Sequence, residues 1–110
     1  MPSGPPNREL SDLAAVLGED NVRTLVRTYL RDFPISFAEM SGGDRKNRHR
    51  LAHSMKSNSR LMGAHDLASR MAALEERLEK DNGLDVTSED LKAIAADFEV
   101  IAGPLRAFVG

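Results

Sequence analysis

The segment from residue 20 to residue 40 carries the pattern that most restricts how this chain of 110 residues can fold. Its apolar side chains recur every three or four positions, the spacing that places them on one face of an α-helix. A half-buried strand would instead alternate at every second position. The segment is therefore predicted to be a long amphipathic helix whose buried stripe consists of Val22, Leu25, Val26, Tyr29, Leu30, Phe33, Phe37 and Met40.

Other segments of the chain repeat this spacing, and turn-forming residues separate them. Pro34 interrupts the long helix, but the apolar stripe resumes beyond it, which favours a kink over a stop. Asp44 is a suitable N-cap, Gly63 a suitable helix terminator, and Thr87 with Asp90 resembles a capping box. The predicted helices cover residues 9–17, 20–40, about 44–62, about 64–80 and 87 onward. In the helix at about 64–80, the charged residues expected to point mostly outward are Glu75, Glu76, Arg77, Glu79 and Lys80.

These helices predict the fold class and the domain organisation. Residues 1–7 contain three prolines and no apolar period, so we expect a disordered leader there, followed by one helical bundle domain at 8–110. A chain of this length suits one domain with a single core. The expected fold is all-α: an up-down-up-down antiparallel four-helix bundle with a short additional N-terminal helix.

Composition excludes several classes of function. The chain has no cysteine, which rules out disulfides and thiolate metal sites, and its net charge of −2 gives no general attraction to nucleic acid or anionic lipid. No apolar run approaches the roughly 20 residues that cross a bilayer. Phosphate-binding loops, nucleophile elbows and zinc-protease motifs are absent from the sequence. We therefore expect a cytoplasmic monomer that binds neither nucleic acid nor membrane and holds no cofactor or metal of its own.

The stretch from Leu51 to Ala64 contains the residue with the most distinctive chemistry, His53. On a helix, Met55 and Met62 would face the core while His53 stands on a solvated, cationic stripe. Asn58 and Ser59 are also expected to point toward the core, where their polar atoms would need hydrogen-bond partners. A neutral imidazole is a competent nucleophile near physiological pH, and a phosphoryl group is a natural electrophile for it. The residues predicted to share the His53 stripe are His49, Arg50, Lys56, Ser57 and Arg60.

The same residues also have simpler interpretations that involve no reaction at His53. An isolated helical histidine is usually an unreactive surface or core residue, and a basic stripe is usually only a solvated face. His49 and His53, one turn apart, could share a transition metal, but no third ligand is evidently placed to complete the site, because His65 lies past Gly63. Nucleic-acid binding is disfavoured by the overall acidity and the scarcity of aromatic residues.

The residues around His53 resemble the histidine-containing phosphotransfer (HPt) family, whose pattern can be written A-H-x-L-K-G followed by G-A-x-x-L. The corresponding stretches here are Ala52-His53-Ser54-Met55-Lys56-Ser57-Asn58-Ser59, then Gly63-Ala64-His65-Asp66-Leu67, with Leu74-Glu75 beyond. The spacing from His53 to Gly63 matches without a gap. The family fold is also an all-helical bundle that exposes its histidine in the middle of a helix.

This resemblance implies a role and partners. His53 would accept a phosphoryl group on Nε2 from a phospho-aspartate of a response-regulator receiver domain and pass it to another receiver. Lys56 would help to position the phosphoryl oxygens. The receiver would supply the aspartate and Mg²⁺, so the chain would be a phosphocarrier without ATP-dependent kinase activity of its own. A hybrid sensor histidine kinase is a further possible partner.

Two positions depart from the family pattern. The usual glycine one turn after the histidine is Ser57 here, whose hydroxyl could crowd a receiver or bind the phosphoryl group, and Arg60 stands at a commonly small position. With His49 and Arg50, these residues are the candidate partner contacts. Two alternatives remain open: a helical adaptor that docks a receiver or another protein without phosphorylation, and a module phosphorylated directly by an ATP-binding kinase domain.

Overall fold

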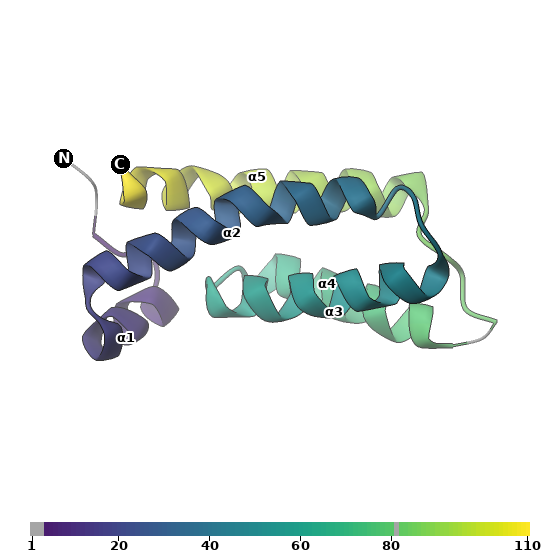
Figure 1. Cartoon of the computed structure of the whole chain (residues 1–110), viewed down its shortest axis with the longest axis horizontal. Coiled ribbons are helices and arrows are strands. Elements are labelled where there is room, and N and C mark those ends of the chain that lie inside the picture. The colour runs from purple at the N-terminus through teal and green to yellow at the C-terminus, as the bar shows by residue number, and fades with distance from the viewer. Residues whose placement is uncertain (1–3, 81) are drawn as a thin grey trace.

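The computed structural model describes residues 4–80 and 82–110, and every regular element in these two ranges is a helix (Figure 1). The predicted all-α class is confirmed, and each helix begins close to its expected first residue. The first four helices also end close to the expected residue, and the fifth continues through Pro104. The helices are α1 (Arg8–Leu17), α2 (Glu19–Glu39), α3 (Arg45–Leu61), α4 (His65–Glu79) and α5 (Ser88–Val109).

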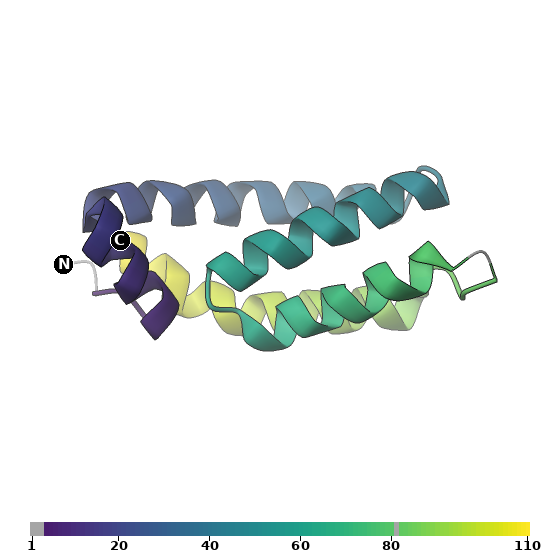
Figure 2. The same ribbon diagram turned by 90° about the horizontal axis from the view of Figure 1, so that it is seen from below.

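The four long helices form two layers (Figures 1 and 2). One layer contains α2 and α5, the other contains α3 and α4, and the chain reverses direction at each connection. The short helix α1 lies at the end of the bundle where α2 begins. This arrangement confirms the predicted four-helix bundle with an additional N-terminal helix, and it places α3 in an outer position where one of its faces meets solvent.

The core lies between the two layers. Its centre is aromatic: the rings of Phe33 and Phe98 stack with centroids 4.4 Å apart, and the Tyr29 ring lies 5.5 Å from that of Phe33. Burial of such apolar area is the main force that holds amphipathic helices together. The largest fully buried apolar side chains are Phe108, Leu10, Met40, Leu67, Met71, Ile94, Leu105, Val22 and Val26.

The predicted helix ends are confirmed. The Asp44 side chain accepts a hydrogen bond from the Asn47 amide at 2.8 Å, and Thr87 and Asp90 form a reciprocal capping box. The helix α2 continues through Pro34, as its unbroken stripe predicted. Gly63, with φ of +77°, ends α3 at the residue expected.

The start of α1 is fixed to the turn between α3 and α4. Asn7 caps α1, accepting from the Leu10 amide at 2.9 Å, and its Nδ2 donates to the Met62 carbonyl at 2.8 Å. A side chain at Gly63 would collide with Asn7, so this close approach needs a glycine as much as the positive φ does. Asn7 is the last residue of the predicted leader at 1–7, whose first three residues lie outside the described part of the chain.

The opposite end of the bundle is held by ion pairs and by hydrogen bonds to backbone carbonyls. We term the side chains involved the far-end cluster: Arg45, Arg48, Arg77, Asp85 and Asp90. Arg48 binds Asp85 through two hydrogen bonds, of 3.0 and 2.7 Å, and Arg77 binds Asp90. Arg45 donates to backbone carbonyls at the end of α4. These contacts join α3, α4 and α5 to the loop that connects α4 with α5.

Candidate functional site

His53 lies in the middle of α3, and 61% of its side chain is exposed. Its Nδ1 is 2.5 Å from Oε2 of Glu75 on α4. An ionised carboxylate can only accept hydrogen bonds, so Nδ1 carries the hydrogen in this contact. The lone pair of the imidazole is then on Nε2, which has no hydrogen-bond partner among residues 4–80 and 82–110.

Glu75 joins His53 to Lys56. Its other carboxylate oxygen, Oε1, accepts a hydrogen bond from Lys56 Nζ at 2.5 Å. Only 14% of the Glu75 side chain and 18% of the Lys56 side chain are exposed. The hydrogen bond from Lys56 is the main cause that lowers the pKa of Glu75, and the one from His53 adds to it, while burial opposes both. The carboxylate is therefore ionised at neutral pH.

The local fold explains how these three side chains meet. The tight turn at Gly63 makes α3 and α4 an antiparallel hairpin, so a residue in the middle of α4 faces the middle of α3. His53 and Lys56 are three positions apart and lie on neighbouring parts of one helix surface. Glu75 is thus within reach of both, with one carboxylate oxygen for each.

Two sequence predictions about this site are wrong. Lys56 was expected on a solvated stripe, but it is largely buried against Glu75. Glu75 was expected to point mostly outward with the other charged residues of its helix, but it points toward α3. A signal was available, since Glu75 follows Leu74 in the family pattern and lies four residues beyond the buried Met71.

His49 does not share the exposed surface of His53. Its side chain is half-buried, and Nε2 is enclosed without a hydrogen-bond partner. It lies beside a shallow depression that Leu78 and Glu79 of α4 also line. The prediction that His49 stands on the solvated stripe is therefore wrong: α4 covers that edge of α3. No group of three or more histidine, aspartate or glutamate residues suited to a metal ion occurs in the described ranges.

Three other predicted residues of the stripe are exposed. Arg50, which lies one turn before His53, donates a hydrogen bond of 2.8 Å to the Asn47 side chain. Ser57 and Arg60 lie beyond His53, where α3 approaches α1. They line a shallow depression between the two helices that we term the α1–α3 groove. Its residues are Glu9, Asp12, Leu13, Val16, Ser57, Arg60 and Leu61.

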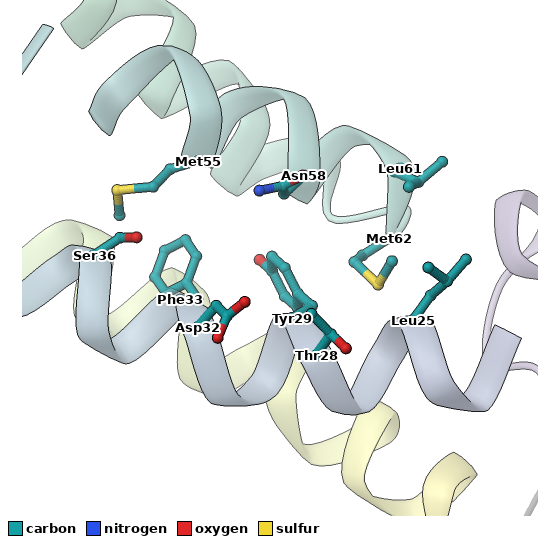
Figure 3. Close-up of a pocket in the computed structure, with 10 residues that line it drawn as sticks. All are labelled: Leu25, Thr28, Tyr29, Asp32, Phe33, Ser36, Met55, Asn58, Leu61 and Met62. Atoms are coloured by element: carbon teal, nitrogen blue, oxygen red, sulfur yellow. The ribbon is translucent and has the colours of Figure 1, made fainter. Parts of the chain in front are cut away.

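The side of α3 that faces α2 carries a polar contact. The hydroxyl groups of Tyr29 and Ser59 are 2.8 Å apart, both residues are buried, and burial raises the pKa of Tyr29 to about 12. Ser59 was predicted to face the core, which is confirmed. The same prediction for Asn58 is wrong, because Asn58 is exposed at the rim of a cleft between α2 and α3 (Figure 3).

The arrangement can do one kind of chemistry well. An exposed imidazole directs Nδ1 at a largely buried carboxylate and leaves Nε2 facing away from that contact, with an ammonium group three residues away. Bundle and site together define a helical protein that exposes one histidine in an arrangement suited to nucleophilic chemistry. No helix in the described ranges is long and apolar enough to span a membrane.

Comparison with known protein families agrees with this class. The model of the Hpt domain family matches residues 10–103. The chain therefore belongs to the Hpt domain family, whose members are histidine phosphotransfer modules of phosphorelays, lack kinase activity and generally interact with receiver domains. Searches of curated proteins and of solved structures gave no match.

Proposed function

We propose that His53 accepts a phosphoryl group on Nε2 from the phospho-aspartate of one receiver domain and passes it to an aspartate of another. The observation that carries this proposal is the hydrogen bond between His53 Nδ1 and Glu75. It fixes the tautomer whose free lone pair is on Nε2, on a side chain that is mostly exposed. A nucleophile must be reachable and must have a free lone pair, and the neutral form of His53 offers both at Nε2.

The transfer step needs no proton to leave Nε2. The Nε2 lone pair forms the new bond to phosphorus while the bond from phosphorus to the aspartate oxygen breaks, and its electron pair stays with the released carboxylate. The imidazole ring then carries a positive charge beside the Glu75 carboxylate. Glu75 therefore stabilises charge that develops only as the reaction proceeds, which is the kind of interaction that accelerates a step.

Lys56 is the proposed second participant. Its ammonium group has three hydrogens, and one of them is used in the bond to Glu75. The others can bind oxygens of a phosphoryl group on the neighbouring His53. The receiver is expected to supply the acceptor aspartate and its Mg²⁺, so the chain itself would act as a phosphocarrier without ATP-dependent kinase activity.

Surface residues around His53 are proposed to contact the receiver. Arg50, Ser57 and Arg60 are exposed on the same side of α3 as His53. Their two guanidinium groups give this side a positive field suited to an acidic docking surface. His49 is left out of the proposed contact surface, because its imidazole is enclosed against α4.

Incubation with receiver domains charged by acetyl phosphate tests the proposed function. Label should move from a charged receiver to the wild-type chain, and mass spectrometry should locate it as an acid-labile group on His53. Loss of label is expected in His53→Gln. The matched control is His65→Gln, which removes another exposed histidine but keeps an amide that can donate to Glu9, so this variant should still be labelled on His53.

Two outcomes would count against the proposal. Equal labelling of wild type and His53→Gln would show that another residue accepts the phosphoryl group. Binding of a charged receiver without any label on the chain would favour the alternative function, a helical adaptor that docks receivers without phosphorylation.

A further inference from the structure

We infer that the α1–α3 groove receives an apolar segment of the receiver domain, and that Asp12 and Arg60 at its rim select the charges of that segment. The inference rests on the proposed function, because the receiver is the occupant. It adds the location of the docking surface and the residues that would distinguish one receiver from another.

The size of an interface requires docking surface beyond His53. A stable protein contact covers about 800 Å² on each partner, far more than one imidazole offers. A receiver whose aspartate reaches His53 Nε2 must therefore cover neighbouring surface as well. Ser57 lies one turn beyond His53 and also lines the α1–α3 groove, so the groove is continuous with the site.

The composition of the groove fits the centre of an interface. Val16 of α1 is 81% exposed and Leu61 of α3 is 45% exposed, both large fractions for aliphatic side chains. Interface centres are depleted of charge and rich in apolar contact. In the opposite direction along α3, the exposed residues nearest His53 are charged, namely Lys46 and Arg50. The apolar side of His53 is therefore the side toward α1.

The apolar surface continues past the groove. Leu61 also lines the cleft between α2 and α3, where it faces Leu25 (Figure 3). An apolar ridge on the receiver that follows the α1–α3 groove would thus meet Leu61 at its far end and Ser57 near His53. This gives the segment a defined path across the end of α3.

The rim of the groove carries opposite charges with little internal compensation. Arg60 forms no ion pair with any residue in the described ranges, whereas Arg45 and Arg48 of the same helix are bound in the far-end cluster. Asp12 is 74% exposed, and its nearest cation, Arg8, is 3.8 Å away and 88% exposed. Charges so placed affect partner choice and association rate more than stability. A receiver segment that fits the α1–α3 groove therefore has an acidic residue facing Arg60 and a basic residue facing Asp12.

The groove is formed before a partner arrives. Its α1 wall is held by the bond from Asn7 to the Met62 carbonyl and by a contact of 2.5 Å between Glu9 Oε1 and His65 Nε2. Both attach α1 to the segment that links α3 with α4. A wall fixed in advance lowers the ordering cost of docking.

The apolar part of the inference is tested with Val16→Asp. The matched control is Leu84→Asp, which places the same charge on another exposed aliphatic residue, 65% exposed, in the connection between α4 and α5. That connection lies at the end of the bundle opposite α1 (Figure 1). From a receiver that labels the wild type, Val16→Asp should slow the initial rate of transfer by about tenfold, and Leu84→Asp should leave the rate unchanged. Phosphoramidate, a small donor that needs no docking surface, should label all three proteins equally.

The possible results distinguish a failure of the docking inference from a failure of the proposed function. Wild-type transfer to Val16→Asp overturns the inference and leaves the proposed function standing. A matching loss with phosphoramidate, or a loss of helicity by circular dichroism, shows that the substitution acts through the fold and overturns the inference as well. Failure of every charged receiver to label the wild type overturns the proposed function together with the inference.

The charge part is tested with Arg60→Glu against Lys46→Glu, an equal change of charge on the other side of His53 along α3. Arg60→Glu should slow transfer by about fivefold at low ionic strength, and the difference should shrink as salt is added. Lys46→Glu should have the smaller effect at every salt concentration. An equal effect of both variants would mean that only the net charge of α3 matters and would overturn the role assigned to Arg60.

Discussion

The far-end cluster and the candidate site are both groups of ionic side chains that cross between helices, and they differ in how completely they are paired. In the far-end cluster, Arg48 and Asp85 bind each other through both carboxylate oxygens. At the candidate site, Glu75 also uses both of its oxygens, but it gives them to two different residues. One of these, His53, has a second ring nitrogen without a partner in the described ranges. Arg48 and Asp85 pair with each other completely, whereas the contacts of Glu75 leave one ring nitrogen of His53 open for the proposed transfer.

This difference indicates what each group does for the protein. The partners in the far-end cluster come from both sides of the loop between α4 and α5, so breaking a pair should loosen that loop and lower stability. The pairs at the candidate site join residues within one helical hairpin that the Gly63 turn already holds together. Breaking them should change reactivity more than stability.

The largest effect is expected from Glu75→Ala. Without the carboxylate, His53 loses the partner that fixes its tautomer and stabilises positive charge on the ring, so transfer to Nε2 should slow by about hundredfold. Glu75→Gln keeps an oxygen acceptor but no charge, so its transfer rate should lie between those of the wild type and Glu75→Ala. Nitrogen NMR of His53 should show a loss of the single tautomer in Glu75→Ala. The control is Glu76→Ala, an exposed neighbour; similar slowing in both variants would contradict a specific role for Glu75.

A smaller effect on transfer is expected from Lys56→Ala. The substitution removes one ammonium group near the incoming phosphoryl oxygens, and the transfer rate should drop by about tenfold while helicity stays unchanged. Lys56→Arg should restore part of the rate, and Lys46→Ala, on the same helix, should have no effect. If Lys56→Ala instead lowers helicity in proportion to the rate, Lys56 has a structural role through Glu75.

At the far end, Asp90→Ala should lower the free energy of unfolding by about 1 kcal/mol without changing transfer, because it removes a helix cap and the partner of Arg77. Burial by itself would raise the pKa of Asp90, but bonds from Arg77 and Thr87 outweigh it and lower the pKa below its ordinary value of 3.8. The stabilisation is therefore complete above that value and is lost as the pH falls through the lower folded pKa.

Chemical denaturation at several pH values checks this prediction. The difference between wild type and Asp90→Ala should be full at pH 7 and should shrink at acid pH below the ordinary pKa of the carboxyl group. Glu89→Ala, an exposed change in the same first turn of α5, is the control for general effects of removing an acid there. A difference that grows toward acid pH would contradict the assigned sign.

The smallest effect is expected from Ser57→Gly. If the Ser57 side chain crowds an approaching receiver, its removal should raise the transfer rate by about threefold, a change that corresponds to less than 1 kcal/mol. Labelling by phosphoramidate should not change, because no receiver approaches in that reaction. No gain with a receiver would contradict the crowding hypothesis and would favour a hydrogen-bonding role for the hydroxyl group.

Much of the fold could be predicted from the sequence, because local rules determine it. The apolar period around Val26 and Phe33 identified α2, and cap chemistry at Asp44 and Thr87 identified where α3 and α5 begin. The position of His53 on an exposed face of α3 followed from the same period. For these features, neighbours in sequence carry the necessary information.

The candidate site was less predictable, because contacts between helices determine it. A helical projection separates inner from outer residues, but it does not show which outer residues another helix covers. The error for His49 arose in this way, since α4 covers the edge of α3 where it lies. Lys56 and Glu75 were each assigned to a solvated face for the same reason. Their partnership depends on how far α3 and α4 are offset along the hairpin.

The hydroxyl contact between Tyr29 and Ser59 has a consequence for the direction in which the protein can be approached. Among buried residues, Ser59 is the single polar one in the described ranges, and its bond to Tyr29 is made inside an otherwise apolar layer. Rotation of α3 about its axis would leave both hydroxyl groups unpaired in the core, at a cost of about 1–3 kcal/mol for each. That bond therefore fixes the direction in which His53 projects from the bundle, because His53 lies less than two turns away on another side of the same helix. The buried bond between Tyr29 and Ser59 thus determines the side of the bundle from which a receiver must approach His53.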